Sequence, residues 1–302
     1  MTTGLDARDA LPALVFDRGR GQVAGRTFKA FAADRTAMLG AVLVGAFGLL
    51  ALLGPVVTSG DPNAIDVTNK FASPSSAHLL GTDELGRDVA TRLVHGARLS
   101  IGTAVLASAG IALIGTFLGT LAGYLGGVVD MVIGRVTDIL LTVPTFLLAL
   151  AVTGVVGTGL DKVIGAVVAV SWAGFARIVR GAVLAERSKP YVESARASGA
   201  GHARVLRRHI VPNVLSPVIV LTTIDMGAVL LGVSALSFLG LGVSPPTAEW
   251  GAMLAEAKTY LAEAPLLMMA PGVAIVLMVL GFNLLGDGFR DVLDPRIDRR
   301  GR

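Results

Sequence analysis

The chain has 302 residues, of which 53% are hydrophobic and only 16% charged, and its mean hydropathy is +0.70. A soluble globular domain has roughly 45–50% apolar and about 25% charged residues, so this composition indicates a membrane protein. The absence of cysteine excludes disulfides, thiolate metal sites and cysteine nucleophiles. The net charge of +4 indicates basic loops beside a membrane rather than nucleic-acid binding in a chain this apolar.

Six segments are apolar enough to cross a membrane, for which a helix needs about 20 residues. They lie near residues 37–57, 99–123, 131–155, 163–183, 213–241 and 265–286. The first 36 residues mix acidic and basic side chains without an apolar leader, so we expect the first helix to stay in the membrane. The sequence therefore predicts an all-α, polytopic protein with six transmembrane helices.

Basic residues gather before the first segment, between the fourth and fifth, and after the sixth, whereas the other long loops have few or balanced charges. Because basic loops stay on the cytoplasmic side, both termini are predicted to be cytoplasmic. The predicted order is a cytoplasmic N-terminal segment (1–36), a first helix (37–57), an extracytoplasmic loop (58–98), a five-helix core (99–289) and a cytoplasmic tail (290–302).

Glycines repeat at four-residue spacing along the second segment, at Gly115, Gly119, Gly123 and Gly127. Such a stripe lets another backbone approach closely, so we predict helix packing there, with gating as the alternative. Prolines lie inside the third, fifth and sixth segments, at Pro144, Pro217 and Pro271. Each removes a backbone hydrogen bond and is expected to kink its helix.

Few charges lie inside the apolar segments. Arg135 and Asp138 are three residues apart on the third segment, where we expect them to form a structural pair. Asp225 lies alone in the fifth segment, and its burial in a membrane is costly unless it has a function. It is a candidate pathway residue or a structural one, and the sequence does not choose between the two.

No motif for intrinsic ATP hydrolysis is present. The lysine of a P-loop follows a glycine. The five lysines here, at positions 29, 70, 162, 189 and 258, follow Phe, Asn, Asp, Ser and Ala. The four histidines have no metal-ligand spacing, and neither a GxSxG nor an HExxH motif occurs. We therefore expect no enzyme activity and no directly bound metal or cofactor.

The basic segment 191–213 has the pattern of two short helices. Good helix formers run from Glu193 to Ala197, and Gly199 is expected to end that helix. A basic helical stretch through Arg208 follows, and Pro212 is expected to stop it. A compact helix–turn–helix on the cytoplasmic side is suited to a groove in a partner protein.

This segment resembles the EAA loop of ABC importer permeases, whose pattern is Glu-Ala-Ala, a glycine soon after and a Leu-Pro ending. Glu193, Ala195, Gly199 and Pro212 match, whereas Ser194 replaces an alanine and Val211 a leucine. In that family the loop docks on the cytoplasmic ATPase. For loop 188–213 the resemblance implies an ATPase-coupling role for Glu193, Ser194, Ala195, Ala197, Gly199, Ala200 and Pro212. From charge alone, the alternative is a basic loop held at the lipid headgroups.

Three further blocks extend the likeness over residues 30–297. They are His78 to Ser100, Leu236 to Gly251 and Asn283 to Arg296. In order and content they resemble the C-type permease of dipeptide, oligopeptide, nickel and glutathione importers. One departure is that many relatives have an acidic residue where this chain has Gly232 and Val233, so no substrate-lining acid is assigned there.

The resemblance implies contact with an extracytoplasmic binding protein at two places. Asp83, Glu84, Arg87 and Asp88 precede the second apolar segment, where capping and salt bridges are an equally good expectation. Glu249 and Trp250 follow a stiff Pro-Pro pair, and for Trp250 anchoring at the membrane interface is the alternative.

The resemblance also implies a type I ABC importer permease fold in a bacterial or archaeal inner membrane, and a set of partners. These are a homologous B-type permease, two ABC ATPase subunits that bind ATP and Mg, a peptide-binding protein and membrane lipid, with no nucleic acid. Dipeptides or short oligopeptides are the expected substrates, with nickel and glutathione as alternatives. A stand-alone secondary transporter is the competing class, but it predicts internal repeats and several midplane charges that this sequence lacks.

Overall fold

The computed structural model describes residues 31–58 and 60–293. Most of the predicted N-terminal segment 1–36 and of the tail 290–302 therefore lies outside the described residues. The described chain is helical and contains no strand, which confirms the all-α prediction. Its helices are α2 (Arg35–Val57), α3 (Val89–Leu125), α4 (Gly127–Thr142), α5 (Thr145–Val156), α6 (Leu160–Arg187), α7 (Pro190–Ala197), α8 (His202–Val205), α9 (Val211–Phe238), α10 (Trp250–Ala257) and α11 (Leu266–Leu293).

Five helices of the described chain are long and apolar enough to cross a membrane, namely α2, α3, α6, the α8–α9 unit and α11. The α4–α5 pair is apolar enough together, but it is bent by 89° at the break between Thr142 and Thr145. The break falls at Pro144, as predicted, because proline lacks the N–H that would continue the helix. With this pair counted as one broken span, the described residues contain six candidate membrane spans, the predicted number. Pro217 and Pro271 lie inside helices that continue past them.

Two predicted boundaries are wrong. Helix α3 begins at Val89 rather than near residue 99, so the preceding loop ends at Asp88. The first turns of α3 are polar, and hydropathy alone assigns them to a loop. Pro212 does not stop a helix, because α8 runs through a π-helical segment (η2, Leu206–Ile210) into α9. Pro212 is the second residue of α9, directly after the π-helical segment.

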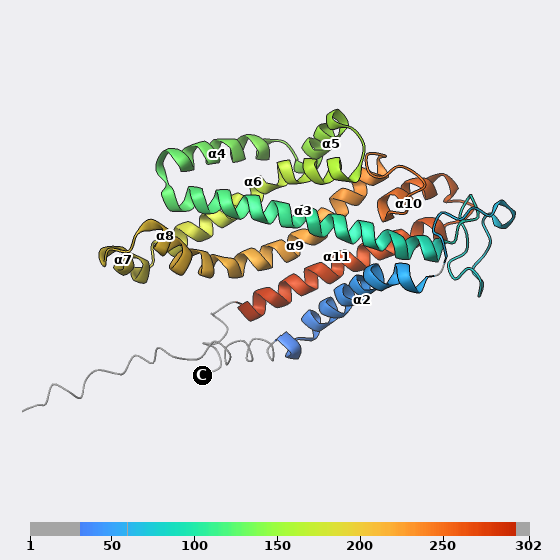
Figure 1. The fold of residues 1–302 in the computed structure, drawn as a ribbon, viewed down its shortest axis with the longest axis horizontal. Coiled ribbons are helices and arrows are strands. Elements are labelled where there is room, and N and C mark those ends of the chain that lie inside the picture. The colour runs from blue at the N-terminus through green and yellow to red at the C-terminus, as the bar shows by residue number, and fades with distance from the viewer. Residues whose placement is uncertain (1–30, 59, 294–302) are drawn as a thin grey trace, which may run out of the picture.

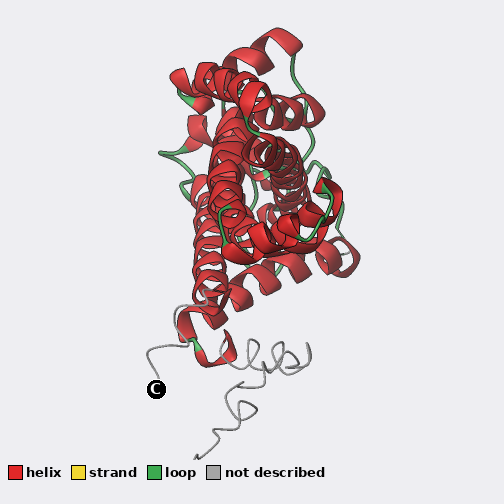
Figure 2. Ribbon diagram, turned by 90° about the vertical axis from the view of Figure 1, so that its left-hand side faces the viewer, coloured by secondary structure: helices red, strands yellow, loops and turns green. Residues whose placement is uncertain are grey.

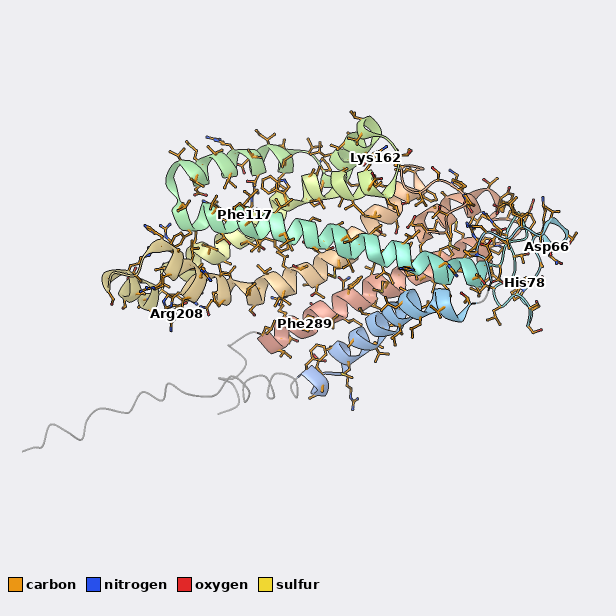
Figure 3. All side chains as sticks on the ribbon, in the orientation of Figure 1. Asp66, His78, Phe117, Lys162, Arg208 and Phe289 are labelled. Atoms are coloured by element: carbon orange, nitrogen blue, oxygen red, sulfur yellow. The ribbon has the colours of Figure 1, made fainter. Side chains whose placement is uncertain are left out.

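The helices run alongside one another, with short elements at both ends (Figure 1). One end, which we call the coupling end, carries α7, α8 and the turn between α3 and α4, and Figure 2 looks onto it. The other end, the loop end, carries residues 60–88, with η1 (Val67–Asn69), and α10, which continues into η3 (Lys258–Tyr260). Asp66 and His78 mark the loop end and Arg208 the coupling end in Figure 3. The start of α2 and the end of α11 point toward the coupling end.

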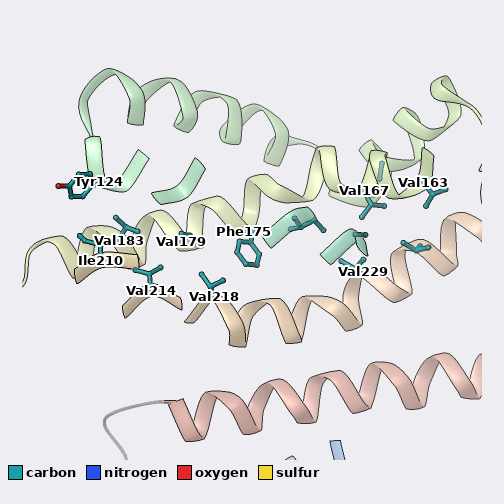
Figure 4. Close-up of a cluster of buried hydrophobic side chains, with 14 of the residues drawn as sticks. Tyr124, Val163, Val167, Phe175, Val179, Val183, Ile210, Val214, Val218 and Val229 are labelled. Carbon is teal, nitrogen blue, oxygen red and sulfur yellow. The ribbon is translucent and has the colours of Figure 1, made fainter. Parts of the chain in front are cut away.

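The largest buried hydrophobic cluster lies where α3, α6 and α9 meet (Figure 4), and a second one packs α2, α10 and α11 against α3. Gly115, Gly119 and Gly123 of α3 face α6, and a Cβ on Gly119 would lie 2.5 Å from the carbonyl oxygen of Ala176. The predicted packing role of the stripe is confirmed for these three glycines. Gly127 instead begins α4, and a Cβ on it would meet nothing within 4 Å. Close backbone approach suits a membrane protein, in which van der Waals packing replaces the hydrophobic effect as the force between helices.

Candidate coupling surface and translocation face

Helix α7 owes its start and its end to specific residues. Pro190 lies in its first turn, where its fixed φ favours helix formation. At the other end, Gly199 N–H donates to the carbonyl of Arg196 at 2.9 Å, and Ala200 N–H donates to that of Ala195 at 3.0 Å. Together with the φ of +83° at Gly199, these bonds form a Schellman motif. The glycine and alanines singled out by the sequence therefore terminate this helix.

One face of α7 is buried and the other is free. Val192 is fully buried against the bundle, whereas Glu193, Ser194, Ala197 and Gly199 are exposed at the coupling end. The hydroxyl of Ser194 donates to the carbonyl of Pro190 at 2.9 Å, within its own helix. Ser194 therefore uses its hydroxyl hydrogen inside α7. Compared with an alanine, it adds no free hydrogen-bond donor to the exposed face of the helix.

Hydrogen bonds and charges hold α7 to helix α6 and to the start of α9. The Tyr191 hydroxyl donates to the buried carboxylate of Glu186 and accepts from Asn213 Nδ2 at 3.1 Å. Lys189 Nζ lies 2.6 Å from the same carboxylate. Burial, and next the hydrogen bond to Glu186, raise the pKa of Tyr191 to about 12. Force applied to α7 thus passes directly into α6 and α9.

The end of α3 is connected to the same unit. His202 Nδ1 lies 3.0 Å from the Tyr124 hydroxyl, and the Arg196 guanidinium lies 5.2 Å from the centre of the Tyr124 ring. Arg187 Nη1 donates to the carbonyl of Tyr124 at 2.8 Å. Tyr124 is therefore a shared contact for three elements of the coupling end.

Helix α4 and helix α6 are joined by charges across their interface. Arg177 Nη2 donates to Asp138 at 2.5 Å, and Arg180 pairs with Asp130. The predicted pair between Arg135 and Asp138 is wrong, because α6 lies beside α4 and brings Arg177 to the aspartate. We call Asp130, Arg135, Asp138, Arg177 and Arg180 the charged face.

The charged face is not suited to lipid. The Asp138 side chain is 62% exposed and that of Arg177 is 51% exposed, although both lie within or beside membrane-spanning helices. Charges at such depth are stable only when they border water or protein. Helices α2, α3 and α11 instead expose large apolar side chains, such as Leu52, Phe117 and Val276. Helix α4 also exposes apolar side chains, such as Val132 and Ile139, so the charged face lies within a mixed surface.

A cavity of about 430 Å³ lies between α5, α6 and α9, next to the charged face. Its lining includes Leu141, one helical turn after Asp138, and Ile178, which is adjacent to Arg177. Most of the wall is apolar, and the polar side chains in it are Thr145, Ser171 and Asp225. The structure therefore places the candidate pathway residue Asp225 in a cavity rather than against another helix.

At the loop end, three of the four charged residues before α3 form an ion-pair network with α10. Arg87 donates to Asp83 at 2.6 Å, to Glu84 at 2.9 Å and to Glu256 at 2.8 Å. Asp88 accepts from Thr91 N–H at 2.7 Å and so caps α3. The predicted capping and salt bridges are confirmed. Glu84 and Asp88 keep partial exposure, so a contact with a binding protein stays a prediction for these two.

Glu249 and Trp250 do not lie on the surface. Both are fully buried. Glu249 caps α10 by accepting from Gly251 and Ala252 N–H groups, and Trp250 Nε1 donates to the carbonyl of Leu93 at 3.0 Å. The predictions of a binding-protein contact and of a membrane-interface anchor are wrong for this pair, because α10 folds back against α3. Sequence reasoning also missed Glu256 and Arg92, whose pairing at 2.9 Å joins segments far apart in the chain.

Two known protein families match parts of this chain. Residues 115–299 match the family described as binding-protein-dependent transport system inner membrane component. Residues 24–74 match the N-terminal transmembrane domain of oligopeptide transport permease C.

Several curated proteins are similar over most of their length. The chain is 40% identical over 270 residues to the dipeptide transport system permease protein DppC of Alkalihalophilus pseudofirmus. These residues cover 89% of each chain. It is 42% identical to the nickel transport system permease protein NikC of Escherichia coli, over 86% of this chain and 94% of that protein. It is 44% identical to the glutathione transport system permease protein GsiD of Pectobacterium atrosepticum, over 78% of each.

Among solved structures, an amino acid ABC transporter crystallised with histidines matches with a TM-score of 0.54 and 17% identity. The match covers 70% of this chain and 94% of that one. At this identity the likeness concerns the fold, which is that of an ABC transporter permease.

Proposed function

The chain belongs to the family of binding-protein-dependent transport system inner membrane components, and from that premise we propose that it carries dipeptides or short oligopeptides through an ATP-driven importer. As a C-type permease it forms half of a translocation pathway in the inner membrane. It is a membrane subunit and not an enzyme, because ATP hydrolysis in this family belongs to a separate subunit.

Peptide is favoured over nickel and glutathione by two observations. The N-terminal match is to an oligopeptide permease, whereas the identities to the dipeptide, nickel and glutathione proteins are nearly equal. The cavity also suits nickel poorly, since its lining has one carboxylate and two hydroxyls but no imidazole.

The exposed face of α7 is the proposed docking surface for the ATPase, and its geometry is the observation that carries the proposal. The helix projects at the coupling end, exposes Glu193 and Ser194, and is tied through Tyr191 to α6 and α9 (Figure 1). A partner that moves α7 therefore moves the two helices that line the cavity. ATP and Mg are expected in the partner subunits, two of which serve the complex.

The remaining partners are proposed from the charged face and from the two ends of the bundle. The charged face needs protein or water, and a homologous B-type permease with the pathway between the two subunits supplies both. The loop end is proposed to be extracytoplasmic and to receive the peptide-binding protein. The coupling end carries exposed Arg204, Arg207 and Arg208, which favours a cytoplasmic position by the positive-inside rule.

The test is purification of the tagged chain in a mild detergent, followed by reconstitution of the recovered complex with its binding protein. We expect a second permease and two P-loop ATPases, and peptide uptake that needs ATP but survives an uncoupler of the proton gradient. A homo-oligomer without ATPases, in a detergent that preserves a known ABC importer in parallel, contradicts the proposal. Uptake abolished by the uncoupler alone indicates a secondary transporter.

A further inference from the structure

Asp225 differs from the acids of helix α4 in having no partner among the described residues. Asp130 and Asp138 are each paired with an arginine of α6. Within residues 31–58 and 60–293, no hydrogen bond or salt bridge is formed by the Asp225 carboxylate. It lies near the middle of α9, far from both ends of that helix.

An unpaired carboxylate in a membrane span is costly, and it is retained where a cavity or a function makes use of it. Asp225 lines the 430 Å³ cavity together with two hydroxyl side chains, Ser171 of α6 and Thr145 of α5. The rest of the wall is apolar and contains no cation. Asp225 is therefore the one ionisable group in the lining of this cavity, and a cation that enters can pair with its carboxylate there.

A larger cavity lacks this chemistry. It measures about 720 Å³ and lies between α3 and α9, where Leu113, Phe117 and Leu215 form an apolar wall. Its one charged side chain is Arg207, and it has no carboxylate. A cationic group thus has a reason to enter the Asp225 cavity and none to enter the larger one.

We propose that Asp225 binds an ammonium group of the substrate in transit, so that an additional side-chain ammonium on the peptide is favoured and an additional side-chain carboxylate is repelled. An ammonium has three N–H donors and no acceptor, which matches a carboxylate flanked by two hydroxyl oxygens. The apolar wall accommodates the side chains of the peptide. This inference rests on the proposed import function, and it makes Asp225 a specificity-determining residue of the pathway.

The position of the cavity supports passage rather than storage. It adjoins the charged face through Leu141 and Ile178, so paired charges lie close to its wall. Its walls come from α6 and α9, the helices to which α7 is tied. Movement of the coupling helix therefore changes the shape of the cavity that holds the ammonium.

The experiment measures selectivity in the complete importer reconstituted with its partner permease, ATPases and binding protein. Uptake of Lys-Ala and of Glu-Ala is measured with saturating amounts of loaded binding protein, and ATP hydrolysis is measured in the same vesicles. We expect Asp225→Asn to lower the Lys-Ala to Glu-Ala uptake ratio about fivefold or more, and Asp225→Glu to keep it within a factor of two. Binding-protein-stimulated ATP hydrolysis in the same vesicles reports whether each variant complex is assembled.

Two further variants separate charge from folding. Asp287→Asn makes the same change at an exposed position of α11 away from the cavity, and its ratio is expected to equal that of the wild type. Ala228→Lys keeps Asp225 but brings a competing ammonium to an exposed residue of the same cavity, so it is expected to lower the ratio as Asp225→Asn does.

The outcomes distinguish this inference from the function on which it rests. An importer in which both Asp225→Asn and Ala228→Lys take up the two peptides in the wild-type ratio overturns the inference and leaves the import function intact. A wild-type complex that takes up no peptide with ATP overturns both.

Discussion

Gly199 and Gly201 show how a single residue can shape the coupling surface. Both are exposed, and a Cβ on either would have open space around it. They differ in backbone, since φ is +83° at Gly199 and −65° at Gly201. A left-handed φ costs a residue with a Cβ about 1–2 kcal/mol, and here it also supports the Schellman motif that ends α7.

Gly199→Val is therefore expected to strain the end of α7 and to lower peptide uptake per ATP hydrolysed severalfold. Gly201→Val introduces the same side chain without a left-handed backbone and is expected to retain coupling. Both ratios are measured in proteoliposomes that contain the complete importer. Full coupling in Gly199→Val would show that the exact end of α7 does not matter for docking.

Glu249 is the buried cap of α10, and its removal is expected to destabilise the loop end. Its carboxylate accepts from two N–H groups of α10 and from Ser100 Oγ at 3.0 Å. Loss of a cap costs about 0.5–2 kcal/mol, and unsatisfied buried donors add to that. Glu249→Ala should lower the melting temperature of the detergent-purified protein by several degrees, and the exposed Glu263→Ala should not. Equal melting temperatures would contradict the capping role.

The contact between Tyr191 of α7 and Glu186 of α6 should make the stability of the coupling end depend on pH in the alkaline range. The pKa of Tyr191 is raised to about 12, above the ordinary value near 10. Because the folded value is the higher one, the contact with Glu186 contributes stability fully below pH about 10 and loses it as pH rises through about 12. Of the 3 tyrosines, Tyr191 should ionise late in a tyrosinate absorbance titration, and Tyr191→Phe should remove that late step. An unchanged late step in the variant would assign it elsewhere.

At the scale of elements, the α3–α6 contact depends on the absence of side chains. A Cβ on Gly119 would lie 2.5 Å from Ala176 O, whereas one on Gly102, in the same helix, would meet nothing within 4 Å. Gly119→Val is expected to cost about 1–3 kcal/mol by forcing the two helices apart. Gly102→Val serves as the control and should leave the thermal unfolding of the purified protein unchanged. Comparable melting temperatures for the two variants would exclude close α3–α6 packing.

The spans could be predicted from the sequence because hydrophobic length is a property of each segment alone. The cap of α3 by Asp88 and the end of α7 at Gly199 were also predictable, since both depend on neighbouring residues. The pairing of Asp138 was not, because its partner Arg177 comes from another helix. The spacing along α4 pointed to Arg135 as the partner, whereas the folded chain brings Arg177 of α6 to Asp138.

The difference between local and long-range contacts also explains why the burial of Trp250 at the loop end could not be predicted. Trp250 follows two prolines in a polar stretch, which is typical of an exposed loop, yet it is fully buried. Its burial depends on the backbone carbonyl of Leu93 and the hydroxyl of Ser100, which are distant in the sequence. Long-range contacts of this kind leave no periodic signal in a single sequence.

At the scale of the whole molecule, the two ends differ in chemistry. The coupling end has exposed arginines and helix α7, which Tyr191 holds to α6 and α9. The loop end has a buried ion-pair network centred on Arg87 and Glu256. Membrane insertion keeps short arginine-rich loops in the cytoplasm, so we expect the coupling end to face the cytoplasm. The start of α2 and the end of α11 lie toward the coupling end, and they should share its side of the membrane (Figure 1).

The chain has no cysteine, so single cysteines can report this orientation without background. Ser76 is exposed in the loop end, and Asp291 is exposed in the last turn of α11, outside the proposed ATPase-docking surface. In intact spheroplasts, a membrane-impermeant maleimide should label Ser76→Cys fully and Asp291→Cys only after permeabilisation. The reverse pattern would place α7 outside the cell, where no ATPase could reach it, and would remove the physical basis of the proposed coupling.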